Sequence, residues 1–417
     1  MTSDEKTTTA RILTPAVIVA ALGYFVDIYD LLLFGIVRKA SLTDLGLVDQ
    51  ANRDAGEYLI SMQMYGMLLG GILWGILGDK KGRLSVLFGS IFTYSVANIA
   101  NGMVHSVDAY AFWRFIAGVG LAGELGAGIT LVAESLPKNK RGYGTMIVAV
   151  VGLTGAIVAN LVYQIFEDWR LCYYAGGVLG LLLLFLRVSV RESFMYKQVE
   201  SGDHERGNFL SLFTDRARFG KYLRCILIGI PLWFLVGVLI TFSPEFAKAL
   251  SVDGAETIKA GQAIAWCYGG LVFGDIMSGL LSQYLQSRKK VMAIFLTLNL
   301  IMVMVYLNAH GLSASMFYLL CMAMGFSVGY WVIFVTIAAE QFGTNIRATV
   351  TTTVPNFVRG SLPPIILLYQ FFRDKTFNGD ILQAGMVVGT ILAVIAFLAL
   401  WKMKETFTAD LDYTETV

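Results

Sequence analysis

The chain has 417 residues, of which 56% are hydrophobic and only 15% are charged, and its mean hydropathy is +0.65. Because about a quarter of the residues in a soluble domain usually carry a charge, these values exclude an ordinary soluble protein and predict a chain that crosses a membrane many times. The net charge of +2 gives no reason to expect a nucleic-acid partner. The cysteines are far apart in apolar surroundings and predict neither disulfides nor a metal site: Cys172, Cys225, Cys267 and Cys321.

Apolar segments follow one another along the whole chain, and each approaches or exceeds the roughly 20 residues that a helix needs to cross a bilayer. They span residues 15–37, 57–78, 84–103, 109–134, 143–165, 169–188, 222–246, 260–283, 290–309, 313–339, 348–371 and 381–402. We therefore predict an all-α membrane protein with twelve transmembrane helices. The polar start MTSDEKTTTA lacks the basic region of a signal peptide, so we expect the first helix to be retained.

The distribution of Lys and Arg predicts the orientation. One side, which includes both termini, carries 22 of these residues in its connections, and the other side carries 8. Since cytoplasmic connections are enriched in Lys and Arg, we expect both termini to be cytoplasmic and the protein to lie in the cell (inner) membrane.

The longest connection, residues 190–220, divides the chain into a six-helix unit at 1–189 and another at 221–417. The sequences AESLPKNKRG at 133–142 and AEQFGTNIRA at 339–348 share a Glu and an Arg at the same spacing. Glu134 precedes Glu340 by 206 residues, and Arg141 precedes Arg347 by the same number. A parallel duplication of the six-helix unit accounts for this repeat.

Three motifs resemble the major facilitator superfamily. GILGDKKGR at 75–83 is similar to its loop signature, and RFIAGVGLAGELGAGITLVAESLPKNKRG at 114–142 resembles helix 4 and the next loop of its sugar porters and metabolite:proton symporters. ALGYFVDIYDLLLFG at 21–35 resembles helix 1 of the same symporters. The resemblance implies two pseudo-symmetric six-helix bundles that rock about a central site.

The same resemblance implies a cytoplasmic gate. Its expected members carry charges at the cytoplasmic ends of helices: Asp79, Arg83, Glu134, Arg141, Glu340 and Arg347. The second half departs from the family pattern, because Gln283 stands where an aspartate is usual. That departure weakens the matching contact in the second half.

Two opposite charges, Arg114 and Glu124, lie within one lipid-length apolar stretch. Each would cost roughly 2.5–3.5 kcal/mol at the bilayer centre, so each should face a cavity or a partner. Ten residues of helix separate them by about 15 Å, too far for a direct salt bridge. Asp27 or Asp30 on helix 1 is the expected partner of Arg114.

The acids near the middle of the first half predict proton coupling. Asp27, Asp30 and Glu124 share one nearby base, Arg114, and a desolvated carboxylate beside another negative charge binds a proton readily. In the alternative interpretation, Asp27 or Asp30 merely holds Arg114 in a structural ion pair.

The second half offers a base in TTTVPNFVRGSLPP, where Thr352, Asn356 and Arg359 share one helix face. The planar fork of Arg359 suits a substrate carboxylate, although an ion pair within the second bundle is the alternative. Asp275 either neutralises Arg359 or has a direct function, and its role stays open.

Aromatic residues predict the rest of the substrate path. The expected substrate-binding residues are Arg359, Asn356, Arg114, Tyr24, Trp233, Tyr330 and Trp331. The 206-residue offset maps Trp233 onto Asp27 and Tyr330 onto Glu124, which suggests proton coupling in the first half and substrate contact in the second.

The sequence contains neither a GxxxxGK[ST] nucleotide loop nor an HExxH zinc motif, so we expect no enzyme activity, cofactor or metal. We predict a monomeric secondary transporter in the lipid bilayer, which takes up a small polar, carboxylate-bearing metabolite with protons. An organic acid, an amino acid or a betaine would fit. Proton-coupled export of organic cations or drugs is the alternative, favoured by the surplus of embedded acids, and a sugar porter is the third interpretation.

Overall fold

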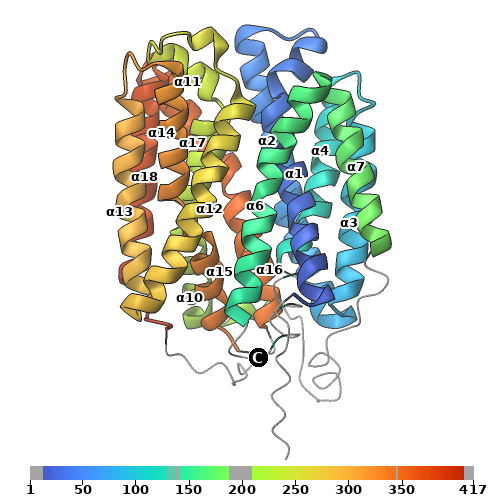
Figure 1. Cartoon of the computed structure of the whole chain (residues 1–417). Helices are drawn as coiled ribbons and strands as arrows, with labels where there is room; N and C mark the ends of the chain where they lie inside the picture. Colours follow the sequence, from blue (N-terminus) through green and yellow to red (C-terminus); the bar gives the residue numbers. More distant parts are fainter. Residues whose placement is uncertain are drawn as a thin grey trace, which may run out of the picture.

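A computed structural model describes residues 13–126, 128, 132, 136, 141–186, 209–343 and 346–407. Within these residues the regular elements are helices, which confirms the predicted all-α class. Figure 1 shows the helices running along a common axis in two groups, with the earlier part of the chain on the right and the later part on the left. The described residues nearest to the two ends of the chain lie at the lower edge of this view, which we call the terminal end; the opposite edge is the far end.

The amino-terminal group is formed by the helices that precede the long connection. Its members are α1 (Pro15–Asp44), α2 (Asp49–Lys81), α3 (Arg83–Asn101), α4 (Val107–Leu121), α6 (Arg141–Phe166) and α7 (Trp169–Leu186).

The carboxyl-terminal group has more interruptions, several of them at prolines. Its members are α9 (Ser211–Thr214), α10 (Arg216–Phe234) with the π turn η2 (Leu235–Ile240), α11 (Ser243–Ala249), η3 (Ala255–Thr257), α12 (Ala260–Leu285), α13 (Arg288–Leu307), α14 (Ala314–Ser327), α15 (Trp331–Glu340), α16 (Arg347–Gly360), α17 (Leu362–Phe371) with the π turn η4 (Phe372–Thr376), and α18 (Ile381–Trp401).

Nine helical segments in the described part are long and apolar enough to span a membrane, counting α10 with η2 and α14 with α15 as single spans. The remaining predicted segments fall on α3, on α4 and the residues after it, and on α16 with α17. The structure therefore supports a multi-pass membrane protein without giving an exact count of twelve.

Local sequence sets where several helices begin. The Thr14 hydroxyl accepts a hydrogen bond from the Val17 amide at the start of α1, and Pro15 occupies the first turn, where a missing amide hydrogen does no harm. Asp380 accepts from two amides at the start of α18 in the same way. These caps satisfy amides that the helix itself leaves free.

Helix breaks recur at the same offset in the two groups. After α4 the chain turns at Ala122 and Gly123 before helix resumes at Glu124. After α14 it turns at residues 328–330 before α15 begins. Positions 122 and 123 map onto 328 and 329 by the 206-residue offset, so the break is itself part of the repeat.

Glycines bring neighbouring helices into backbone contact. A Cβ atom at Gly118 of α4 would meet the carbonyl oxygen of Gln63 on α2, and one at Gly325 of α14 would meet the carbonyl of Cys267 on α12. Small residues allow this approach in membranes, where no hydrophobic force drives helices together.

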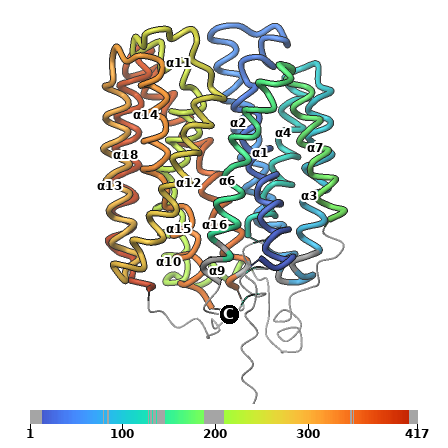
Figure 2. Tube along the Cα trace, in the orientation of Figure 1, coloured from blue at the N-terminus to red at the C-terminus, as the bar shows by residue number. Residues whose placement is uncertain are grey.

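The two groups meet along two pairs of helices. α6 packs against α12, and Figure 2 shows them side by side at the seam. α2 packs against α16, where a Cβ atom at Gly71 would lie 2.7 Å from Asn356 Cβ. The residues that line the centre of the molecule come from α1, α6, α10, α12, α15 and α16.

Candidate functional site

Arg359 lies at the centre of the molecule on α16, and only 1% of its side chain is exposed. Its Nη2 atom lies 3.9 Å from Oδ2 of Asp27 on α1, whose side chain is fully buried. Its Nη1 atom lies 3.5 Å from Oδ1 of Asn356, one turn earlier. The pair thus joins the two helix groups. It differs from two of the pairings that the sequence left open, Asp27 with Arg114 and Arg359 with Asp275, and it leaves Asp30 as the helix 1 acid near Arg114.

The contact between Asp27 and Arg359 is loose. A separation of 3.9 Å is too long for a hydrogen bond, and neither Asp27 oxygen has a hydrogen-bond partner among the described residues. A buried ion pair of this geometry compensates poorly for desolvation. Both groups therefore keep most of their capacity to bind something else.

Two tryptophans flank the guanidinium. The Arg359 Cζ atom lies 5.6 Å from the ring centroid of Trp233 on α10 and 5.6 Å from that of Trp331, the first residue of α15. Both distances are within the range of a cation–π interaction. The indole N–H groups of both tryptophans are buried without a well-formed hydrogen bond in the described part of the chain, although the Tyr24 hydroxyl lies near Trp331.

These residues surround a small central cavity of about 10 Å³. Its lining consists of Tyr24, Ile28, Leu153, Leu232, Trp233, Tyr268, Leu271, Trp331 and Arg359. Such a volume holds about one water molecule, so a metabolite could occupy the site only after the two helix groups separate. Four of the predicted substrate residues line this cavity, whereas Asn356 supports Arg359 from beside it and Tyr330 is buried in the helix break.

Arg114 lies elsewhere, in a separate polar cluster within the amino-terminal group. Its Nη2 donates to Oε1 of Gln63, its Nη1 lies 3.4 Å from the Tyr173 hydroxyl, and its Cζ lies 4.9 Å from the Phe34 ring centroid. Asp30 is fully buried in the electrostatic range of Arg114 and lacks a well-formed hydrogen bond to the described residues. The cluster is distinct from the central cavity, which Arg114 does not line.

Glu124 stands at the point where helix resumes after α4. It is 2% exposed and accepts a hydrogen bond of 3.1 Å from Ser90 on α3. Asp27 lies within its electrostatic range. Glu124 is thus a buried acid between the cavity and the terminal end.

Asp275 on α12 serves the other helix break. Its Oδ1 accepts a hydrogen bond of 3.2 Å from the Val332 amide in the first turn of α15. A carboxylate is stabilised there because the first amides of a helix point outward and carry the positive end of the helix dipole. Asp275 is therefore bound to the backbone that positions Trp331, and Asp27 is the acid that faces Arg359.

The predicted gate at the terminal end is only partly visible. Glu134 and the side chains of Asp79, Arg83 and Arg141 lie outside the described residues. Glu340 forms a salt bridge of 3.2 Å with Arg288, and the Arg347 Nε donates to the carbonyl oxygens of Ala339 and Phe342 at 3.1 and 3.2 Å. Arg288 is a partner that the sequence reasoning missed, although its place in the basic run RKK was a signal.

The far end contains charged contacts that the sequence reasoning did not anticipate. Arg38 Nη2 on α1 lies 2.6 Å from Oε1 of Glu245 on α11, and Arg373 Nη1 in η4 lies 2.8 Å from Oε1 of Glu57 on α2. Gln370 donates to the other Glu57 oxygen at 2.5 Å. Each contact joins the two helix groups. The acidic residues at the ends of these apolar segments were the feature of the sequence from which such contacts could have been predicted.

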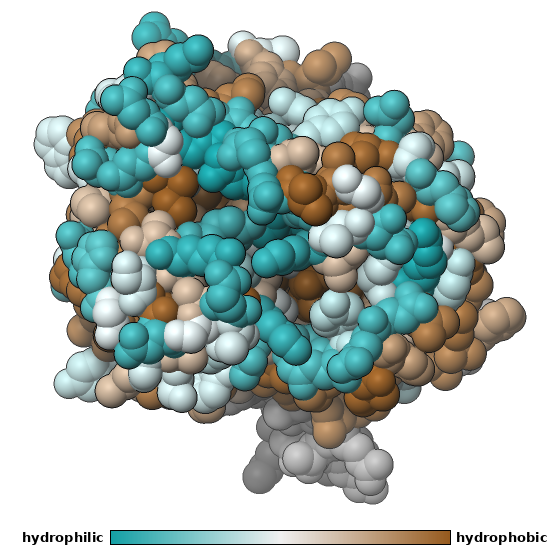
Figure 3. All heavy atoms as spheres, turned by 90° about the horizontal axis from the view of Figure 1, so that it is seen from above, coloured by the Kyte–Doolittle hydropathy of each residue, from teal (hydrophilic) through white to brown (hydrophobic). Residues whose placement is uncertain are grey.

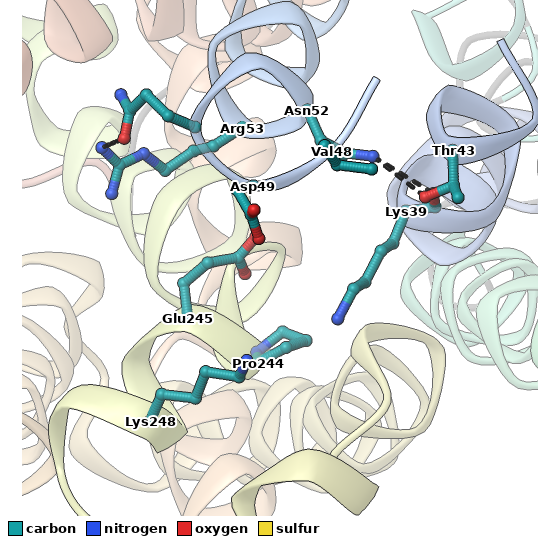
Figure 4. A pocket seen from close by; sticks show the side chains of 10 residues that line it. Lys39, Thr43, Val48, Asp49, Asn52, Arg53, Pro244, Glu245 and Lys248 are labelled. Carbon is teal, nitrogen blue, oxygen red and sulfur yellow. Dashed lines mark hydrogen bonds between the residues drawn. The ribbon is translucent and has the colours of Figure 1, made fainter. Parts of the chain in front are cut away.

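A pocket of about 300 Å³ lies above these contacts. Figure 4 shows that side chains from α1 and α2, among them Lys39 and Asp49, face side chains from α11, among them Glu245, across it. Seen from above in Figure 3, hydrophilic side chains gather over this end of the molecule. The pocket therefore lies over the seam between the two groups.

Known proteins resemble this chain over most of its length. The sequence profile of the Major Facilitator Superfamily matches residues 13–365. A protein of Haemophilus influenzae named as a metabolite transport protein is 26% identical over 368 residues, which are 84% of this chain and 88% of that protein. The niacin transporter NiaP of Acinetobacter baylyi is 23% identical over 420 residues, 91% of this chain and 92% of the relative.

A solved structure matches the fold. The proton:xylose symporter XylE bound to 6-bromo-6-deoxy-D-glucose superposes with a TM-score of 0.71 over 95% of this chain and 97% of that one. The sequence identity is 16%, so this likeness concerns the fold alone.

Proposed function

Because this chain belongs to the major facilitator superfamily, we propose that it takes up a small carboxylate-bearing metabolite together with protons. Its relatives are named as transporters, so the chain is a membrane transporter and not an enzyme. The coupling to protons, the carboxylate substrate and the direction of transport are our proposal.

The observation that carries the proposal is the loose ion pair between Asp27 and Arg359, 3.9 Å apart at the seam of the two helix groups. Among the described residues, Arg359 is the one charged residue that lines the central cavity, so an ionised Asp27 and a substrate carboxylate compete for it. Two carboxylates beside a single buried guanidinium leave an uncompensated charge. Binding of a proton to Asp27 removes this conflict and frees Arg359 for the substrate.

This competition makes the process a symport. The substrate anion binds well only when Asp27 carries a proton, so the two move together when the site changes its access from one side to the other. Asp30 and Glu124 are then secondary acids that exchange protons with Asp27. Arg114 sets the charge balance around Asp30.

Alternating access requires contacts that break at each end. We assign the far end to the outside, so the Arg38–Glu245 and Arg373–Glu57 contacts close the outer path. Asp79, Arg83, Glu134 and Arg141 form the corresponding lock on the cytoplasmic side. A change in either set shifts the equilibrium between the two states.

Export of organic cations is the second candidate, because aromatic rings line the cavity and the Asp27 carboxylate, beside Arg359, has no hydrogen-bond partner among the described residues. The two functions differ in the ligand that stabilises the purified protein. We expect a carboxylate such as nicotinate to raise the unfolding temperature of the wild type at pH 6, and tetraphenylphosphonium to have no effect.

The matched variants for this test are Arg359→Ala and Arg218→Ala, since Arg218 is also buried but lies at the terminal end, away from the cavity. The stabilisation by carboxylates should disappear in the first variant and persist in the second. A thermal shift with tetraphenylphosphonium and none with any of a panel of carboxylates would favour the cation exporter.

A further inference from the structure

The chemistry of the central cavity constrains the body of the substrate. Apart from Arg359, its lining consists of two tryptophans, two tyrosines and four aliphatic residues. No carboxylate, amide or small hydroxyl side chain lines it in the described part of the chain. A polyhydroxylated solute would lose its water here without gaining equivalent hydrogen bonds, and buried polar groups without partners are costly.

The same cavity has more free donors than acceptors. The Nε1 atom of Trp233 and the Nε of Arg359 are buried without hydrogen-bond partners among the described residues, and the Nε1 atom of Trp331 makes no well-formed hydrogen bond there, although the Tyr24 hydroxyl lies near it. These donors lie on side chains that face one another across the cavity, with the guanidinium 5.6 Å from both rings. One ionised carboxylate accepts about four hydrogen bonds, so it can satisfy such a set by itself.

Resting on the proposed function, we infer that the substrate is a compact monocarboxylate with a flat, mainly apolar body, and that the indole N–H groups of Trp233 and Trp331 help to select it. The carboxylate occupies Arg359 and the indole donors, while the body packs on Tyr24, Tyr268 and the aliphatic residues. A second carboxylate on the substrate would be buried without a base, because the described residues provide no cation besides Arg359 in the cavity lining.

The test compares four solutes by isothermal titration calorimetry on the full chain at pH 6. Nicotinate has one carboxylate on a flat ring, nicotinamide replaces it by a neutral amide, quinolinate adds a second carboxylate, and N-acetylneuraminate is a hydroxyl-rich acid. We expect nicotinate to bind at least tenfold more tightly than each of the others. Equal or tighter binding of quinolinate or N-acetylneuraminate would overturn the inference.

The tryptophan variants test the proposed donors. Trp233→Phe and Trp331→Phe keep an aromatic ring beside Arg359 but remove the N–H, and each should weaken nicotinate binding about two- to tenfold. Trp266→Phe is the control, because Trp266 is partly exposed on α12 and does not line the cavity. Wild-type affinity in both cavity variants would contradict the donor role.

The outcomes also separate this inference from the proposed function. If N-acetylneuraminate binds best and its binding is lost in Arg359→Ala, the carboxylate transporter stands and the apolar monocarboxylate is wrong. If the preferred solute binds Arg359→Ala as well as the wild type, the proposed function itself fails.

An independent observation concerns the chain after α18. Glu405 accepts hydrogen bonds from the Arg288 amide at 2.9 Å and from the Ser287 hydroxyl, both at the start of α13. Lys289 Nζ donates to the carbonyl oxygens of Trp401 and Met403, each at 2.8 Å. Burial raises the pKa of Glu405, but these hydrogen bonds outweigh it and hold the pKa below its usual range.

The same segment reaches the predicted gate. Thr406 donates to Glu340 at 2.8 Å, and Arg288 joins Glu340 at 3.2 Å. We infer that residues 403–407 form a strap across the terminal end of the carboxyl-terminal group, held by the contacts of Glu405 and Thr406. The strap therefore connects the start of α13 with the end of α15.

Glu405→Gln tests the strap, with Glu256→Gln at the far end as the control. Hydrogen–deuterium exchange on the full chain should become at least fivefold faster for amides 287–290 in Glu405→Gln, while nicotinate affinity stays within twofold of the wild type. The control should leave exchange at 287–290 unchanged. Wild-type exchange rates at 287–290 in Glu405→Gln would overturn the strap.

Discussion

Replacement of Arg359 is the substitution with the clearest expected magnitude. Arg359→Ala removes the one charged group that the described part of the chain contributes to the lining of the central cavity. A hydrogen bond to a charged group contributes about 1.5–3 kcal/mol, and each 1.4 kcal/mol is a tenfold change in Kd. Loss of one such contact should therefore raise the Kd about 10- to 150-fold. If the substrate contact is bidentate, the increase in Kd should lie at the upper end of this range.

The effect on folding should be smaller than for a tight buried ion pair. Removing one partner of a well-formed pair costs about 3–5 kcal/mol. Asp27 lies 3.9 Å from Arg359 and can take up a proton when its partner is lost, so we expect only a moderate fall in the unfolding temperature. Arg359→Lys keeps the charge but loses the planar fork, and it should fall between the wild type and Arg359→Ala in affinity.

The assay is calorimetric titration of nicotinate into purified protein at pH 6, with Arg218→Lys as the control. Arg218 is buried at the terminal end and donates to the Ser211 carbonyl at 2.7 Å, so its replacement should leave the Kd unchanged. A Kd for Arg359→Ala within twofold of the wild-type value would refute the assignment of Arg359 to the substrate.

Three further predictions concern the two ends of the molecule. Glu57→Gln should weaken the far-end contacts by about 1 kcal/mol and raise the ratio of outward-open to closed states about fivefold. A membrane-impermeant reagent should then label a cysteine introduced at Leu232 faster than in the protein that keeps Glu57. Asp79→Asn should favour the inward-open state, and unaltered labelling of cytoplasmic cavity positions would contradict the lock. The pKa of Glu405 is lowered in the folded protein, so its contribution to stability is complete at neutral pH and is lost as the pH falls through that lowered value. The pH-corrected hydrogen-exchange rate of amides 287–290 should therefore be constant from pH 6 to 8.

The position of each embedded charge along its helix was the part of the site that the sequence could predict. The rise per residue of a helix places Asp27, Glu124 and Arg359 near mid-membrane, and the apolar context marks each as a costly charge that needs a partner. The internal repeat singled out Trp233 and Tyr330, of which Trp233 lines the central cavity with Arg359, as does Trp331, which was expected on the path as an aromatic residue.

The pairing of these charges could not be predicted in the same way. Depth says nothing about the direction in which a side chain leaves its helix, or about which helices become neighbours across the seam. Arg114 was therefore expected to face Asp27 or Asp30 without a choice between them, and the structure puts Asp30 in its electrostatic range, whereas Asp27 faces Arg359 on the other helix group. Arg114 is bound by Gln63 and Tyr173 inside its own group.

The sequence also did not predict contacts between segments that lie far apart along the chain. Arg38 and Arg373 counted only as charges in connections, yet both side chains are buried in contacts that join the helix groups. Glu405 lies 117 residues from Arg288, and its role depends on how the chain after α18 folds back. The local pattern of apolar residues does not predict which distant segment the chain contacts after it folds back.

Proton coupling at Asp27 is the central claim, and paired transport assays in proteoliposomes test it most directly. Asp27→Asn cannot release a proton, so it should lose accumulation of the tightest-binding labelled carboxylate under an imposed pH gradient. The same variant should retain counterflow, because exchange of substrate needs no net proton movement. Wild-type accumulation by Asp27→Asn under the pH gradient would contradict the account and place the coupling proton on another acid.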